Sequence, residues 1–299
     1  MKVLIAIDSS PASERVLNEA VARPWPEGTT FSVVNVVDIH RFTRLPALIE
    51  DAKREADRIV KDGAEKLSRP GHEALSEVIV GFPRRAISEY AKEWQAGLIM
   101  AGSHGHSAIG RFLLGSVAQG ILRTAPCSVE IVRSAAGTPA PSSHPMKILL
   151  ATDGSDCSVE AVQAIASRPW PKGTVFKVLS VEELMVLDGQ MGASSLSPIY
   201  PASLLEELTT QARERARSAF QAARQILFRA GMAVLDDYAI EVGEPRALIL
   251  DTAKTWGADL IVLGSHGLRG MDRFLLGSVS EAVAIHAKCS VEVIRSQSA

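Results

Sequence analysis

The sequence predicts an α/β fold made of two tandem, doubly wound units, and three observations carry this prediction. The chain of 299 residues is about two domains long. Strand-like and helix-like segments alternate along it, which is typical of parallel sheets with helices on both faces. The second half repeats the first: Asp8 matches Asp153 at an offset of 145 residues, and Gly102 matches Gly264 at an offset of 162. We therefore expect domains over residues 1–135 and 146–299, joined by a proline-rich linker over 136–145.

The first half contains five strand patterns and the helices between them. The first strand segment, Lys2–Ile7, is almost continuously apolar, as expected for a strand buried on both faces. The segment Leu48–Leu67 carries charges at helical spacing around one apolar stripe, which predicts a surface helix. The other predicted strands are Phe31–Val37, Leu75–Val80, Leu98–Ala101 and Ser128–Arg133, and the other helices are Ser13–Ala22, Pro83–Gln95 and Val117–Thr124.

The second half repeats this order with one insertion. Its predicted strands are Lys147–Thr152, Val175–Val181, Val234–Val242, Leu260–Leu263 and Ser290–Ile294. The change of offset from 145 to 162 places 17 extra residues in or near Leu184–Ser203. A plain surface loop is the commoner outcome for such an insertion, and a lid or a partner surface is the alternative.

Composition excludes several classes of function. A hydrophobic share of 46% and a charged share of 22% predict a packed globular core. The net charge of −2 gives no electrostatic case for binding nucleic acid or an anionic membrane. No apolar run approaches the roughly 18 residues of a membrane span. Three scattered cysteines do not form a disulfide framework, and we expect Cys127 and Cys289 to be buried thiols of a cytoplasmic protein.

A glycine-rich loop follows the fourth strand of each half. Residues 102–116 read GSHGHSAIGRFLLGS and residues 264–278 read GSHGLRGMDRFLLGS, so both halves carry G-x-x-G, nine residues, then G-S. Glycine allows a ligand to approach the main chain closely. Free N–H groups in such a loop, together with those at the start of the next helix, favour anions. The Ser116 hydroxyl is placed to cap that helix or to touch a phosphate.

An acidic residue follows the first strand of each half, Asp8 in one and Asp153 in the other. In open parallel sheets, ligands bind beyond the carboxyl ends of the strands where the strand order reverses. If the first and fourth strands are neighbours, each aspartate shares one crevice with a glycine-rich loop. The alternative role for each aspartate is to cap the following helix.

Taken together, these features resemble a tandem protein of the universal stress protein family. The resemblance covers nearly the whole chain, and the glycine spacing is the mark of the ATP-binding branch. It implies the strand order 3-2-1-4-5 in each half and pairing of the fifth strands across a dimer, here within one chain. It also implies further dimerisation of the tandem chain, an unknown protein partner and a regulatory role in the stress response.

The resemblance implies one ATP site per half, with Mg²⁺ or Mn²⁺ accompanying the triphosphate and no metal ligand assigned to the protein. The aspartates would meet the adenine or ribose, Val36 and Val181 the adenine edge, and the loops and helix starts the ribose and phosphates. The candidate residues are Asp8, Val36, Gly102, His104, Gly105, Arg111, Gly115, Ser116 and Val117 in the first half, and Asp153, Val181, Gly264, His266, Gly267, Arg273, Gly277, Ser278 and Val279 in the second.

The two halves depart from each other, so we expect two unequal sites. Ser9 stands where the second half has Gly154, and Gly97 stands where it has Asp259. No catalytic residue is assigned, because no fixed acid or nucleophile is evident beside His104 or His266, and a histidine in a loop more often hydrogen-bonds the loop backbone. The P-loop, dinucleotide and nucleophile-elbow motifs are missing. A slow ATPase and a nucleotide-free interaction module are the alternative functions.

Overall fold

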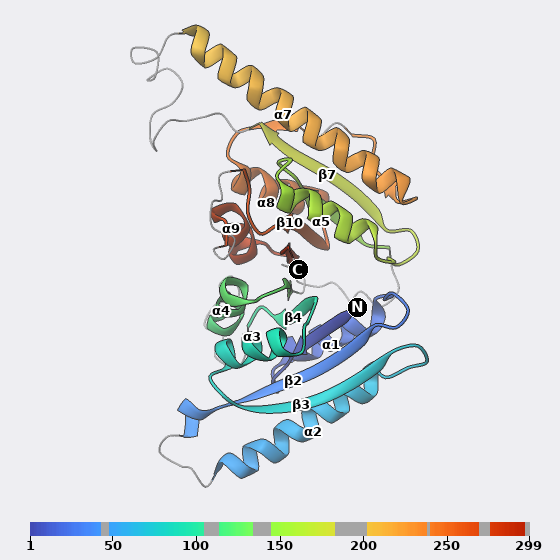
Figure 1. Ribbon diagram of the computed structural model, residues 1–299, viewed down its shortest axis with the longest axis vertical. Helices are drawn as coiled ribbons and strands as arrows, with labels where there is room; N and C mark the ends of the chain where they lie inside the picture. The colour runs from blue at the N-terminus through green and yellow to red at the C-terminus, as the bar shows by residue number, and fades with distance from the viewer. Residues whose placement is uncertain are drawn as a thin grey trace.

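The computed structural model describes residues 1–42, 48–104, 114–133, 145–182, 202–237, 240–268 and 276–296. In Figure 1 the first half of the chain lies below and the second half above, and each is an α/β unit. Of the sequence candidates, Gly105, Arg111 and Arg273 lie outside the described residues, as do most of the predicted insertion and the linker.

The first half follows the predicted order of elements. Its elements are β1 (Lys2–Ala6), α1 (Pro11–Ala22), β2 (Thr30–Asp38), a short 3-10 helix (Ile39–Phe42), α2 (Ile49–Leu67), β3 (Glu73–Gly81), α3 (Pro83–Glu93), β4 (Leu98–Gly102), α4 (Ser116–Thr124) and β5 (Ser128–Val132). The apolar run of β1 is buried as expected, with Val3, Leu4 and Ile5 all fully inaccessible. The charged face of α2 carries exposed ion pairs, while Val60 and Leu67 on its other face are buried.

The second half repeats these elements with a longer helix. They are β6 (Lys147–Ala151), α5 (Asp156–Ala166), β7 (Val175–Glu182), α7 (Ala202–Arg229), β8 (Ala233–Val234), β9 (Ile240–Val242), α8 (Pro245–Trp256), β10 (Leu260–Gly264), α9 (Ser278–His286) and β11 (Ser290–Ile294). The 28-residue α7 takes the place of the 19-residue α2, and the two helices lie at opposite ends of the molecule in Figure 1.

The prediction of one strand over Val234–Val242 is wrong. Val175 of β7 lies opposite Ala233 of β8, whereas Ser180 of β7 lies opposite Ile240 of β9. Five steps along β7 therefore match seven steps along its neighbour, so two extra residues interrupt the strand. Acidic residues at the interruption are poor strand formers. Asp236 accepts a hydrogen bond from Arg224 instead (2.6 Å).

All strands belong to one eleven-stranded sheet among the described residues. Its order is β3-β2-β1-β4-β5-β11-β10-β6-β7-β8, with β9 also paired to β7. Each half thus has the predicted order 3-2-1-4-5, and the first and fourth strands are neighbours in both. The fifth strands, β5 and β11, pair antiparallel within the chain, with Glu130 opposite Glu292. The halves are therefore related by a pseudo-twofold axis at this seam.

Buried ion pairs lie under the seam. Arg23 donates to both carboxylate oxygens of Glu130 and to Glu19 (2.7 Å each), and Arg168 donates to Glu292 (2.8 Å). Burial raises the pKa of Glu19 and of Glu292 above the usual range, against the opposing effect of the arginines. The packing of the two halves thus includes charges that are fully removed from water.

Both predicted structural thiols are buried. Cys127 and Cys289 are 1% and 7% exposed, and burial raises the pKa of each to about 12. Within the described part of the chain, no helix combines the length and apolar character that crossing a bilayer requires.

Candidate functional site

The second half brings its acid and its glycine-rich loop into direct contact. Asp153 lies two residues beyond β6, and Leu268 lies four residues beyond β10. The main-chain N–H of Leu268 donates to Asp153 Oδ2 at 3.0 Å. A Cβ added to Gly267 would lie 2.5 Å from the same oxygen, so glycine is needed for this approach. The two sides of the expected crevice therefore meet in this half.

Ser155 links Asp153 to the start of α5 through hydrogen bonds. Ser155 is the N-cap of α5, and its hydroxyl oxygen accepts a hydrogen bond from the Ser158 N–H. The same hydroxyl donates to Asp153 Oδ1 (2.6 Å) and lies 3.3 Å from the His266 carbonyl oxygen. Ser155 is not among the site residues predicted from the sequence. The sequence feature that could have identified Ser155 is its place two residues after the acid, at the start of a helix.

In the first half, the acid is held by the first turn of its helix. Asp8 Oδ1 accepts hydrogen bonds from the Ser10 N–H (2.9 Å) and from Ser13 Oγ (2.7 Å). The Asp8 N–H in turn donates to Ser13 Oγ (2.7 Å). The N-cap of α1 is Ser10, and no side chain caps this helix, so Asp8 braces the turn before the helix rather than capping it. The second carboxylate oxygen makes neither of these bonds.

The main chain at the two acid corners differs as the sequence predicts. Gly154 has a φ of +80°, a left-handed conformation that side chains with a Cβ rarely adopt. Its counterpart Ser9 does not have a positive φ. In addition, a Cβ on Gly154 would lie 3.2 Å from that of Ala219, because α7 passes over this corner. The two candidate sites thus have different walls.

Glycine at the end of the fourth strand has a steric explanation of its own. A Cβ on Gly102 would lie 2.9 Å from Ala12 Cβ of α1. A Cβ on Gly264 would lie 2.7 Å from the carbonyl carbon of Cys157 and 2.8 Å from the Ser158 nitrogen of α5. Close packing of strand ends against helix starts therefore requires these two glycines, whether or not a ligand binds there.

The helices that follow the two loops begin at glycine. Gly115 is the N-cap of α4 and Gly277 that of α9, and neither helix start has a side-chain cap. Ser116 is the first helical residue and makes no such cap, so of its two predicted roles only the phosphate contact stays open. Ser116 and Ser278 are both exposed. The first-turn N–H groups of the two helices are thus not taken by a capping side chain, which suits an anion.

Each loop histidine is oriented by the serine before it. His104 Nδ1 lies 2.9 Å from Ser103 Oγ, and His266 Nδ1 lies 2.9 Å from Ser265 Oγ. Among the residues that the structure describes, no group of three or more His, Cys, Asp or Glu side chains is placed to hold a metal ion. These histidines are consistent with a role in shaping the loop.

Val36 and Val181 lie where their strands run past the first strand of their half. The last register pair between β1 and β2 is Ala6 with Val34, and the Asn35 side chain then donates to the Ile7 carbonyl oxygen (3.0 Å). Val36 follows directly, beside the Asp8 corner. In the second half, Glu182 follows Val181, is 2% exposed and accepts a hydrogen bond from Arg213 (3.2 Å). A buried acid at this place was not predicted, because the first half has a valine there.

The fold and the position of the two acids define a class, the tandem doubly wound α/β proteins with a glycine-rich loop beside the first strand. The model of the universal stress protein family matches this chain twice, over residues 1–133 and 145–295. Those matches cover most of the chain. The chain therefore belongs to the universal stress protein family.

Sequence relatives agree with this family assignment, and a solved structure agrees with the fold. A universal stress protein of Synechocystis is 42% identical over 91 residues, which are 30% of this chain and 55% of that protein. A relative from Staphylococcus aureus is 31% identical over 138 residues, 44% of this chain and 83% of that protein. The crystal structure of a universal stress protein from Archaeoglobus fulgidus covers 98% of this chain and 96% of its own, with a TM-score of 0.64 and 21% identity. The structural likeness supports the tandem fold.

Proposed function

We propose that each half of this protein binds one ATP molecule and that the protein acts in the stress response as a regulator that reports nucleotide state. The observation that carries the proposal is the contact of Asp153 with Gly267 and Leu268. This contact supports the proposal because the acid and the glycine-rich loop lie side by side in the second half. An acid suits the hydroxyl and amino groups of a nucleoside, and the loop suits its phosphates.

The phosphates would lie at the starts of α4 and α9. Both helices present uncapped first-turn N–H groups behind a glycine, and a helix start carries about half a positive charge. In this proposal Gly115, Ser116 and Val117 face the phosphates in the first half. Gly277, Ser278 and Val279 take that role in the second.

A divalent cation, Mg²⁺ or Mn²⁺, would be held mainly by the triphosphate itself. The described residues offer no acidic cluster for it, and Asp8 and Asp153 are already hydrogen-bonded to neighbouring groups. The ion would reduce the charge of the phosphates in the crevice. The protein's own residues would bind and orient the nucleotide, so no catalytic residue is assigned.

The same proposal places the protein in the cytoplasm, as a homodimer of tandem chains with a protein partner. That partner would read the nucleotide state through a change in the shape of the protein or in its contacts with the partner. A slow ATPase would release phosphate above a no-enzyme control, with that release lost when both loop histidines are replaced. A pure interaction module would bind no nucleotide at all.

The test is to count ATP sites on the purified full-length chain by equilibrium dialysis with labelled ATP. We expect two sites of different affinity, because the corners at Ser9 and Gly154 differ. Two indistinguishable sites would contradict the predicted asymmetry. The absence of any site would contradict the proposed function.

A further inference from the structure

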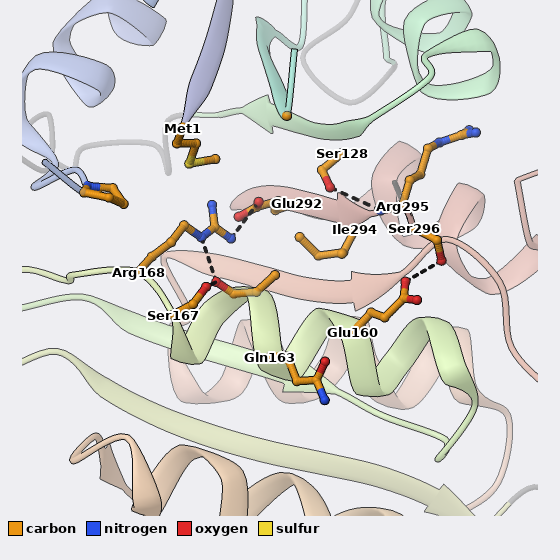
Figure 2. A pocket seen from close by; sticks show the side chains of 13 residues that line it. Met1, Ser128, Glu160, Gln163, Ser167, Arg168, Glu292, Ile294, Arg295 and Ser296 are labelled. Carbon is orange, nitrogen blue, oxygen red and sulfur yellow. Dashed lines mark hydrogen bonds and ion pairs between the residues drawn. The ribbon is translucent and has the colours of Figure 1, made fainter. Parts of the chain in front are cut away.

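A second candidate binding site lies at the seam between the two halves, away from the proposed nucleotide crevices. Figure 2 shows this cavity of about 530 Å³ between α5, the end of β11 and the edge of the first half. The lining residues used below are Met1, Gly97, Glu160, Ala164, Arg168, Glu292 and Ile294. Neither Asp153 nor the glycines of the loops line it, and the inference does not depend on the proposed function.

The pseudosymmetric counterpart of this cavity shows which group lies beside the equivalent arginine. Arg23 and Arg168 are equivalent positions, as are Glu130 and Glu292. Beside Arg23, the Glu19 carboxylate supplies a further acceptor and bonds Arg23 Nη2 at 2.7 Å. Glu19 is only 4% exposed, so this carboxylate is part of the packed seam on that side of the axis.

On the other side of the axis, this carboxylate is missing. Ala164 stands at the position equivalent to Glu19. Arg168 donates through Nη2 to Glu292 (2.8 Å) and through Nε to the Ala164 carbonyl oxygen (3.1 Å). The Arg168 side chain is only 8% exposed. Its Nη1 atom is buried and has no hydrogen-bond partner among the described residues. A buried guanidinium nitrogen of this kind calls for an acceptor.

A second acid is missing from the same side. Gly97 stands where the second half has Asp259, whose carboxylate accepts a hydrogen bond from the Lys147 N–H (2.8 Å). Asp259 also lies close enough to Glu19 to raise the pKa of that carboxyl further. The cavity thus opens where two small residues, Ala164 and Gly97, replace two acids on the opposite side of the pseudosymmetric seam.

We propose that this cavity binds a small monocarboxylate with a short apolar tail, whose carboxylate takes the place of the Glu19 carboxylate and accepts from Arg168 Nη1. A single carboxylate suffices for the one guanidinium nitrogen of Arg168 that has no partner, because Nη2 and Nε already donate to Glu292 and Ala164. The tail would lie against apolar lining side chains, Met1 and Ile294 among them. Glu160 and Glu292 also line the cavity, so a polyanion such as a nucleotide is disfavoured by like charge. The volume lies within the range of ordinary small-molecule sites.

The test is calorimetric titration of the full-length protein with sodium butyrate, in the presence of saturating ATP. We expect one site per chain with a dissociation constant of about 1 mM, as befits six non-hydrogen atoms. Ala164→Glu, which rebuilds the missing carboxylate within the chain, should weaken butyrate binding at least about tenfold. Asn18→Glu, a matched charge change on α1 outside the cavity, should bind butyrate like the wild type.

A second variant guards against misfolding. Gly97→Asp restores the other missing acid from a different element and should also weaken butyrate binding, while both variants keep the wild-type circular dichroism spectrum. Failure of the wild type to bind butyrate at any accessible concentration would overturn the proposal. Undiminished binding by both folded variants would overturn it as well.

Discussion

Asp153 and Leu268 are joined by a hydrogen bond of 3.0 Å from the main-chain N–H of the loop residue to the carboxylate. The bond crosses from the end of the first strand of its half to the loop after the fourth. It requires those strands to be neighbours, and it requires glycine at position 267. One contact therefore links strand order, loop composition and the proposed nucleotide site.

Replacing Asp153 should loosen the glycine-rich loop of the second half and leave the first half unchanged. Asp153→Ala removes the acceptor of the Ser155 hydroxyl and of the Leu268 N–H. A hydrogen bond to a charged group contributes about 1.5–3 kcal/mol. We therefore expect ATP affinity at one site to fall about ten- to a hundredfold. Titration of the full chain with a fluorescent ATP analogue measures this, and unchanged affinity at both sites would be the contrary result.

A negative charge at the start of α4 should weaken phosphate binding at the first site. Gly115 has an extended φ of −61° that aspartate adopts readily, and aspartate is a good N-cap. Gly115→Asp should repel phosphates from the first site. Its added side chain is a close fit, because a Cβ on the equivalent Gly277 would lie 3.0 Å from the Ser265 carbonyl oxygen. Gly115→Asn, which caps without a charge, is the matched control. ATP binding by both variants as by the wild type would contradict the placement of the phosphates.

Removing one partner of the buried ion pairs at the seam should lower the free energy of unfolding. Arg23→Met leaves Glu19 and Glu130 buried without their shared cation. Loss of one partner of a buried pair costs about 3–5 kcal/mol of unfolding free energy. Arg58→Met removes an arginine from exposed pairs on α2 and should change stability little. Urea unfolding of both variants checks this, and equal stabilities would count against the seam as described.

Stability should also depend on pH through Glu292. Burial raises its pKa in the folded protein above the ordinary value of 4.5. A carboxyl with a raised folded pKa stabilises the protein fully below the unfolded pKa, and this contribution is lost as the pH rises through the folded pKa. The stability of Glu292→Gln relative to the wild type should therefore increase upward from about pH 4.5. Urea unfolding at several pH values tests this, and a difference independent of pH would refute it.

Much of this architecture was predictable from the sequence because burial leaves a periodic signature. The apolar runs Lys2–Ile7 and Leu260–Leu263 predicted β1 and β10 to within one residue at each end, and the apolar stripe among the charges of Leu48–Leu67 predicted α2 equally closely. The repeat predicted the neighbouring first and fourth strands once the family resemblance supplied the strand order. The broken strand at Ala233–Val234 was not predictable, because two extra residues change the register without changing the apolar pattern.

The candidate sites were predictable only in part. The acid and the glycines stand out in the sequence, whereas Ser155 and the buried Glu182 depend on contacts between distant segments. The steric need for Gly264 against Cys157 is likewise invisible without packing. The cavity at Arg168 opens where Ala164 stands at the position equivalent to Glu19. The sequence alone does not show that this position is buried at a seam.

The most direct test of the central claim is to denature the purified full-length protein and identify by mass spectrometry any nucleotide that is released, after incubation with ATP and removal of free ligand. We expect up to two molecules of ATP per chain, and fewer from Gly115→Asp. Release of no nucleotide from folded protein under these conditions would contradict the claim.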